Sequence, residues 1–244
     1  MIEVSSVEIK WYQTWWGKAL AFLTVLVVVA LVGLAGLVVK YWWTITHGGG
    51  DQLAEQIGLG DTTGKANLLA IRREVEDNKK PYLGSASAPN AIVEFVDFKC
   101  PNCKAAAPIL HQVLQKYGDK VKLIIRHFPV ESTHPGASRL SEVAVCAHEQ
   151  GNFWWFYDYF YQNQDQIGEV ITASDISGWV NAAGLDPFKF NQCLGSGRAR
   201  IEVNKDYALG VKYNFLGTPT FFVNGVKVGG VPSFQAWDKV LKTL

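Results

Sequence analysis

The segment EFVDFKCPNC (residues 94–103) decides the predicted fold of this chain. It closes an apolar, β-branched run at residues 91–97 and opens an Ala-rich run at residues 101–117 that Gly118 terminates. β-Branched and aromatic residues favour a strand. A proline at the first helical position, followed by helix formers, favours a helix. The segment therefore predicts a strand that gives way to a helix at Cys100.

Two cysteines lie at this predicted junction, and their positions predict different roles. Cys100 occupies the N-cap position, where free backbone N–H groups and the positive end of the helix dipole stabilise a thiolate and lower the pKa. Pro101 is tolerated at the first helical position, and the spacing keeps Cys103 within reach of Cys100. We therefore predict that Cys100 is a catalytic nucleophile and that Cys103 is the thiol that closes or releases its disulfide.

A zinc site is the alternative interpretation of a CxxC pair, because such pairs also occur in metal knuckles. Zinc needs two further ligands. The other cysteines, Cys146 and Cys193, form no second CxxC pair, and the five histidines include no pair at zinc-ligand spacing. We predict no metal site and no bound cofactor.

The regions on both sides of this unit extend a pattern of strands and helices. A second β-branched run covers residues 121–128, and a short hairpin around Asn224-Gly225 predicts strands at 220–223 and 226–229. The residues between these strands have helical patterns, and a final helix follows Ser233 as its N-cap. The predicted helices cover residues 137–150, 152–164, 174–183, 187–194, 196–213 and 233–243. Two groups of strands separated by a block of helices indicate an α/β fold.

The composition excludes several classes of protein. The 244 residues carry 23 basic and 22 acidic side chains, a net charge of +1, so the chain lacks the basic footprint of a nucleic-acid-binding protein. Only four cysteines are present, too few for a disulfide scaffold of this length. Charged residues make up 18%, against about 25% in an ordinary soluble domain. We therefore predict no nucleic-acid partner. The low fraction of charged residues indicates that part of the chain is a long uncharged, apolar segment.

Residues 19–39 supply that segment, because they contain no charged side chain. As a helix they would be about 31 Å long, which matches the hydrocarbon core of a bilayer. Aromatic residues flank the run at 15–16 and 41–43, where they would lie at the two membrane interfaces. A cleaved signal peptide is the alternative, but the run is longer than its usual apolar region. Lys10 and Lys18 precede the run and only Lys40 closely follows, which favours a cytoplasmic N-terminus.

The predicted organisation has four parts. Residues 1–18 form a short tail, 19–39 a transmembrane helix, 40–84 a connector with short helices, and 85–244 one globular domain. Within that domain the helical insertion covers about residues 132–214. The 160 residues of the domain are enough to bury one core.

At this point the sequence resembles the thioredoxin superfamily, specifically the DsbA-like thiol-disulfide oxidoreductases, over residues 85–244. Three features carry the resemblance: the segment EFVDFKCPNC, the segment FLGTPTFFVNG at residues 215–225, and the helical block between them. The resemblance implies a thioredoxin fold with a helical insertion. It also implies that Pro219 is a cis-proline facing the CxxC and that Thr218 tunes substrate binding and cysteine pKa. An ordinary turn proline is the alternative for Pro219.

The resemblance also predicts that Glu94 and Asn102 are site residues. Glu94 is a charged residue in an otherwise apolar strand, which is costly without a purpose. In the superfamily an acidic residue here lies beneath the CxxC and moves protons, so burial should raise its pKa. A solvent-facing carboxylate is the alternative. Asn102 stands where strongly oxidising relatives carry histidine, and it lacks the cation that would further stabilise the Cys100 thiolate.

Cys146 and Cys193 fall in separate predicted helices of the insertion. Some members of the resembled family carry a second, structural disulfide, so the resemblance supports a bond between them. Such a bond would close a 48-residue loop and fits an oxidising compartment. Two separate buried thiols are the alternative.

The apolar segment at residues 19–39 and the resemblance together predict a membrane-tethered, extracytoplasmic enzyme, periplasmic or at the cell surface, that forms disulfides in exported proteins. Its partners would be reduced unfolded proteins, the lipid bilayer through residues 19–39, and a quinone-linked membrane oxidase that regenerates the disulfide. Two alternatives remain open. The same fold acts as a reductase or isomerase if electrons flow the other way. A tethered chaperone would hold unfolded clients on an aromatic surface and use no thiol chemistry.

Overall fold

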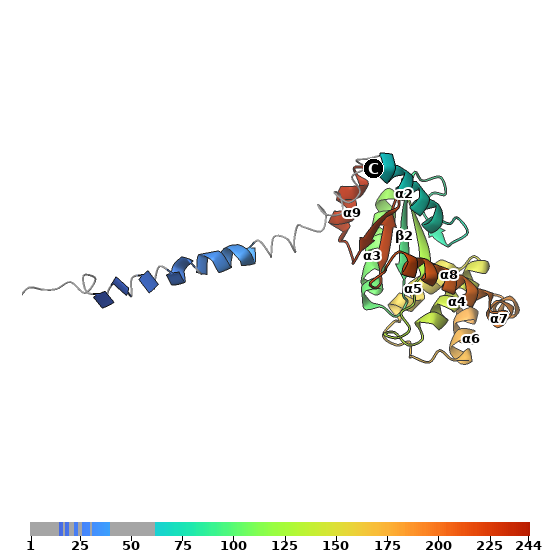
Figure 1. Ribbon diagram of the computed structural model, residues 1–244. Helices are drawn as coiled ribbons and strands as arrows, with labels where there is room; N and C mark the ends of the chain where they lie inside the picture. The colour runs from blue at the N-terminus through green and yellow to red at the C-terminus, as the bar shows by residue number, and fades with distance from the viewer. Residues whose placement is uncertain (1–14, 17, 20–21, 24–25, 30, 40–61) are drawn as a thin grey trace, which may run out of the picture. The chain divides into compact units, whose positions relative to one another are not determined.

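The computed structural model describes residues 15–16, 18–19, 22–23, 26–29, 31–39 and 62–244, in two units divided at Gly49–Gly50 (Figure 1). Every described residue of the first unit is helical and exposed. Among the described residues, no helix is both long enough and apolar enough to cross a membrane. Residues 20–21, 24–25 and 30 of the predicted membrane segment lie outside the described residues, so the segment stays a prediction.

The second unit is built on a five-stranded sheet with the order β1-β3-β2-β4-β5. Strands β2 and β3 are parallel, and the other neighbouring pairs are antiparallel. The central strand β2 is buried on both faces because its sequence is apolar at nearly every position. The strands are β1 (Tyr82–Leu83), β2 (Asn90–Val96), β3 (Val121–His127), β4 (Thr220–Val223) and β5 (Val226–Gly229).

Helices cover both faces of this sheet. On one face, Ile92 and Val96 pack in a large core with Leu110 of α3, Phe156 of α5 and Trp237 of α9. Helices α4, α6, α7 and α8 gather toward one end of the sheet (Figure 1). The helices are α2 (Thr62–Val75), α3 (Pro101–Tyr117), α4 (Ala137–Glu149), α5 (Phe153–Gln162), α6 (Ala173–Ala182), α7 (Pro187–Gly195), α8 (Arg198–Lys212) and α9 (Phe234–Leu241).

Part of the region predicted to be a connector, residues 40–84, instead packs in a smaller core on the opposite face of the sheet. Val75 of α2 is fully buried there with Val93 and Phe222 of the sheet. A Cβ atom on Gly225 would lie 2.7 Å from the carbonyl oxygen of Leu68, so α2 also approaches the β4–β5 turn closely. Helix α2 and strand β1 are therefore parts of the folded unit rather than a connector. Residues 40–61 of the predicted connector lie outside the described residues.

The predicted elements of the remaining chain agree with the structure to within about two residues at each end. Strands β4 and β5 have the predicted bounds, and Ser233 caps α9 by accepting a hydrogen bond from the Ala236 N–H. Thr172 forms a capping box with Asp175 at the start of α6. The predicted mixed α/β architecture, with helices between the two groups of strands, is confirmed.

The sheet topology places the CxxC segment. Because β2 and β3 run in parallel, with Val96 paired with His127, both strands end at the same edge of the sheet. The chain leaves β2 at that edge and enters α3 at Pro101. The antiparallel strand β4 begins at the same edge, opposite Phe95. The loop before β4 is thereby brought to the CxxC segment.

Candidate active site

Cys100 and Cys103 lie at the N-terminal end of α3, both as free thiols. Cys100 is the N-cap residue with extended backbone angles, and Pro101 occupies the first helical position. Pro101 and Asn102 are exposed, whereas Cys103 is fully buried and Cys100 keeps 5% of its surface accessible. Of the two cysteines, only Cys100 retains accessible surface.

The surroundings of Cys100 lower its pKa to about 5 from the ordinary 9.0. The hydrogen bond from the Cys103 thiol contributes most, and burial opposes it. The Thr218 side chain and the backbone N–H groups of Asn102 and Cys103 add smaller contributions. Cys100 is therefore ionised at neutral pH, and its partner thiol stabilises the thiolate more than the helix terminus does.

The pKa of Cys103 shifts in the opposite direction, well above its ordinary value. Burial is the main cause, and the hydrogen bond to Cys100 and the charge of ionised Glu94 add to it. The proton shared by the pair therefore resides on Cys103. The site holds one thiolate that borders solvent and one protonated thiol beneath it.

The Thr218–Pro219 peptide bond is cis and lies against Cys100. In the thiol form, Cys100 Sγ donates a hydrogen bond to the Thr218 carbonyl oxygen at 3.2 Å. The Thr218 hydroxyl is buried and has no hydrogen-bond partner in the thiol form, so it is available to donate a hydrogen bond to the Cys100 thiolate. The two sequence segments that suggested the fold therefore meet in space.

Glu94 is fully buried on the sheet face that also carries Ile92 and Val96. Its Oε2 atom accepts a hydrogen bond from the Tyr157 hydroxyl at 3.1 Å, while Oε1 has no partner. Burial raises the pKa of Glu94 to about 8, and the Tyr157 bond only partly offsets this. The carboxyl group is therefore protonated at neutral pH and electrostatically coupled to Cys103.

The structure adds site residues that sequence analysis missed. Tyr157 on α5 contacts Glu94, as described above. Gln164, in the loop after α5, is buried and donates through Nε2 to the carbonyl oxygens of Phe98 at 2.9 Å and Cys100 at 3.1 Å. Lys99 Nζ donates to the Ile167 carbonyl at 2.6 Å. The aromatic run at 153–161 was the only sequence signal for this region, and it predicts burial without identifying a contact.

Asp97 is a second missed residue, at the exit of β2. It is fully buried, and its carboxylate accepts hydrogen bonds from the Val130 N–H at 2.8 Å and the Lys99 N–H at 2.7 Å. His134 Nδ1 lies 2.8 Å from the same carboxylate. Asp97 thus holds the CxxC loop to the loop that follows β3. An acidic residue at the end of an apolar strand was the available signal.

Cys146 and Cys193 form a disulfide that joins α4 to α7, with a Cα–Cα distance of 5.7 Å. Both residues are buried in the large core. The predicted pairing is confirmed, and the alternative of two separate thiols is wrong. Among the described residues, no group of three or more His, Cys, Asp or Glu side chains is placed to hold a metal ion.

Similarity to known proteins extends over most of the chain. The chain is 31% identical over 178 residues to a protein named Na(+)/H(+) antiporter NhaA 3 from Salinispora tropica, a match that covers 73% of this chain and 26% of that protein. The chain thus spans about a quarter of the length of this relative.

Solved structures show the same fold. The thiol-disulfide exchange protein α-DsbA2 from Wolbachia pipientis superposes with a TM-score of 0.62 at 19% identity, covering 73% of this chain and 94% of that one. The catalytic domain of ScsC from Proteus mirabilis superposes with a TM-score of 0.61 at 18% identity, covering 73% and 97%. The sequence model of the family described as Thioredoxin matches residues 76–243, well over half of the chain. With its CxxC at a helix start facing a cis-proline, this chain belongs to the thioredoxin family and has a DsbA-like fold.

Proposed function

We propose that this protein is a thiol-disulfide oxidoreductase that forms disulfides in exported proteins. One observation carries the proposal: the two thiols of the CxxC have opposite pKa shifts, to about 5 for Cys100 and well above 9.0 for Cys103. A solvent-bordering thiolate is the attacking species in disulfide exchange, and a low-pKa thiol is also a good leaving group. The cis-proline loop beside Cys100 offers extended backbone for a substrate strand.

The reaction begins with the oxidised enzyme, in which Cys100 and Cys103 are joined. A substrate thiolate attacks Cys100 Sγ, and the bond to Cys103 breaks, so the Cys103 sulfur leaves with the electron pair. A second substrate thiolate then attacks the substrate sulfur of the mixed disulfide, and Cys100 leaves as a thiolate. The substrate loses two electrons and gains a disulfide, while the CxxC gains two electrons.

Glu94 is the proposed proton donor to Cys103. The departing Cys103 sulfur is fully buried, so a bare thiolate there is strongly disfavoured. Glu94 is protonated at neutral pH because burial raises its pKa to about 8. Transfer of this proton leaves Cys103 as a neutral thiol and moves the single buried charge to Glu94, and it is favourable because the pKa of Cys103 lies well above 9.0. Thr218 and Pro219 position the substrate strand, and Asn102, which is exposed between the two cysteines, adds no cation to the site.

The direction of electron flow that we propose follows from the thiolate. Stabilising the Cys100 thiolate stabilises the reduced enzyme, which makes the disulfide form a better oxidant. The buried Cys146–Cys193 disulfide supports an oxidising compartment. A protein in such a compartment needs a partner that removes the two electrons from the reduced CxxC. A quinone-linked membrane oxidase is the partner class proposed here.

Residues 19–39 are the proposed membrane anchor, with a cytoplasmic N-terminus and the catalytic domain on the periplasmic or cell-surface side. Support comes from the uncharged run, the flanking aromatic residues and the lysines before it. A tether of this kind would hold the enzyme near both exported clients and the membrane oxidase. The antiport activity in the relative's name belongs to a chain of which this one spans about a quarter, and the proposal assigns no ion transport to this protein.

Replacement of Cys100 tests the proposed reaction. The Cys100→Ser variant should lose all oxidation of a reduced test protein, measured by thiol loss and by mass. Incubated with a disulfide-bonded test protein, the Cys103→Ser variant should accumulate mixed disulfides, because its Cys100 thiolate attacks the substrate disulfide and no Cys103 thiol remains to release it. Oxidation at the wild-type rate by Cys100→Ser would contradict the proposal. The Cys146→Ser, Cys193→Ser double variant is the matched control, and its CxxC should still react.

A further inference from the structure

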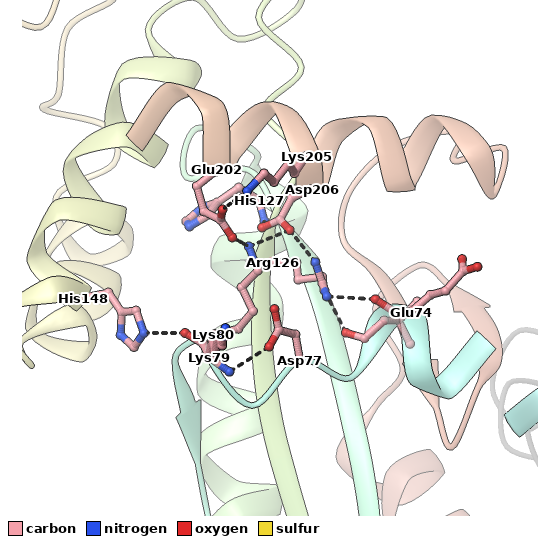
Figure 2. A network of polar contacts seen from close by, with 11 residues as sticks. Glu74, Asp77, Lys79, Lys80, Arg126, His127, His148, Glu202, Lys205 and Asp206 are labelled. Atoms are coloured by element: carbon pink, nitrogen blue, oxygen red, sulfur yellow. Dashed lines mark hydrogen bonds and ion pairs between the residues drawn. The ribbon is translucent and has the colours of Figure 1, made fainter. Parts of the chain in front are cut away.

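A cavity of about 340 Å³ lies apart from the CxxC site. Its walls come from the loop at Lys79–Pro81, the end of β3 at His127, and helices α4 and α8. Figure 2 shows Lys80, His127 and Glu202 together between α8 and this loop, with His148 on the neighbouring helix α4. None of these residues takes part in the proposed disulfide exchange.

The carboxylates that line the cavity are already fully engaged. The two oxygens of Glu202 bind different lysines, Lys80 and Lys205. Both oxygens of Glu149 accept hydrogen bonds from Arg198, each at 2.7 Å. Since every carboxylate oxygen in the wall has a cationic partner, the wall offers no free carboxylate oxygen to a bound cation.

The donors of the wall are in excess. Four cationic side chains line the cavity against two carboxylates, a difference of two positive charges: Lys79, Lys80, Arg198 and Lys205 against Glu149 and Glu202. The Lys79 ammonium has no carboxylate partner among the residues that the structure describes, and Lys205 Nζ has only Glu202 at 3.2 Å. Asp206 lies behind Lys80 at 2.8 Å, but it is also bound by Arg126 and so does not offset the excess.

His127 adds a buried polar group without a partner. Its side chain is 1% exposed, it lines the cavity, and its Nδ1 atom has no hydrogen-bond partner. Burial lowers the pKa of His127 to about 4, so the ring is neutral at pH 7 and carries one N–H. Native proteins rarely leave such a group unpaired, which indicates that a ligand or solvent completes the site.

We propose that this cavity binds a small anion with a phosphate-like group, held by Lys79 and Lys205 and facing the imidazole of His127. The excess of cationic donors, the engaged carboxylates and the unpartnered imidazole all favour an anion. A metal cation is disfavoured because the described residues contain no cluster of three metal-ligating side chains and the wall has no free carboxylate oxygen.

The test is an isothermal titration calorimetry experiment in which inorganic phosphate is titrated into the full chain. Saturable binding is expected. The Lys79→Ala and Lys205→Ala variants should each weaken it by about tenfold, the effect of one lost charge-assisted hydrogen bond. Lys120→Ala is the matched control, an exposed lysine in the turn before β3, and should bind as the wild type does.

A second readout protects the test against loss of the fold. Phosphate should shift the imidazole nitrogen resonances of His127 in the unaltered protein, while the ring of His111, which lies beside Asp158, should not respond. Absence of saturable binding, or binding that neither lysine variant weakens, would overturn the proposal. The Cys100→Ser variant should bind phosphate normally, so failure of the redox proposal leaves this result interpretable.

A competition arm identifies the source of the phosphate group. Vesicles of phosphatidylglycerol and of phosphatidylcholine both accept the proposed anchor, but only the first offers an anionic headgroup. Displacement of phosphate by phosphatidylglycerol alone identifies a lipid headgroup as the ligand. Phosphate binding that both vesicles leave unchanged identifies a free phosphate compound.

Discussion

At the scale of single residues, the reactivity of Cys100 depends on the buried thiol beside it. The hydrogen bond from Cys103 is the largest cause of the low pKa of Cys100. Cys103→Ala removes that donor, so the Cys100 pKa should rise from about 5 toward its ordinary value. The pH dependence of alkylation of the reduced protein measures this pKa. Cys103→Ser keeps a donor and should shift the midpoint less, whereas equal midpoints in all three proteins would show that Cys103 has no such role.

Glu94 gives a prediction about stability and pH. Its pKa is raised from 4.5 to about 8 in the folded protein. The unfolded chain ionises this group above about pH 4.5, but the folded protein does so only near pH 8, so its contribution to folding is lost as the pH rises through that window. The Glu94→Gln variant does not lose this stability, because glutamine does not ionise. Between pH 4 and pH 7 the free energy of unfolding of the variant should therefore rise by on the order of 3 kcal/mol relative to that of the wild type.

Urea unfolding of the oxidised proteins measures the Glu94 effect, because Cys100 and Cys103 do not titrate in that form. Asp165→Asn serves as the control, since Asp165 is a highly exposed carboxylate. The difference between wild type and Glu94→Gln should grow steadily between about pH 5 and pH 8. A difference that stays constant with pH would mean that Glu94 ionises normally in the folded state.

The sequence identifies the central residues of the site because their signals are local. The CxxC spacing, Pro101 and the Thr218-Pro219 pair can be recognised within a few residues of chain. Gln164 and Tyr157 cannot be recognised in this way, because their hydrogen-bond partners, Phe98 and Glu94, lie more than sixty residues away in the sequence. No short-range pattern states which aromatic ring of α5 faces Glu94. Such contacts come from tertiary packing alone.

At the scale of secondary structure, the Cys146–Cys193 disulfide is the main covalent constraint on the helical insertion. It joins α4 to α7 across a 48-residue loop and is buried. Replacing both cysteines by serine should reduce the free energy of unfolding by about 2–4 kcal/mol, because the unfolded chain regains loop entropy. Thermal unfolding of the reoxidised variant measures the loss. A fall in CxxC reactivity as large as that of Cys100→Ser would show instead that the bond is part of the active site.

The same scale shows which elements a sequence can predict. Helices such as α6 carry their own start signal, Thr172 with Asp175, and strands β4 and β5 are defined by the Asn224-Gly225 turn. Strand β1 has only two residues and exists because it pairs with β3. Helix α2 is fixed by burial of Val75 and by Arg126, which donates to the Val75 carbonyl at 2.7 Å. Both lie in the region predicted to be a connector because their stabilising partners are distant in sequence.

At the scale of the whole molecule, the folded unit joins two distinct chemical regions on one scaffold. The edge where β2 ends carries the CxxC and the cis-proline loop. The end of β3 leads into a charged network in which Lys80, Arg126 and Asp206 connect the loop before β1, the sheet and α8 (Figure 2). Phe98, two residues before Cys100, lies with its ring centroid 6.0 Å from that of His127. The two regions are therefore neighbours through packed rings.

The equilibrium of the full chain with glutathione redox buffers tests the central claim most directly. Alkylation would trap the free thiols, and mass measurement would give the oxidised fraction of Cys100 and Cys103 at each buffer ratio. A disulfide donor should have a potential at or above that of oxidising compartments, about −200 mV or higher. A value near about −270 mV, as in thioredoxin, would contradict the proposed direction and indicate that electrons flow from this protein to its substrates.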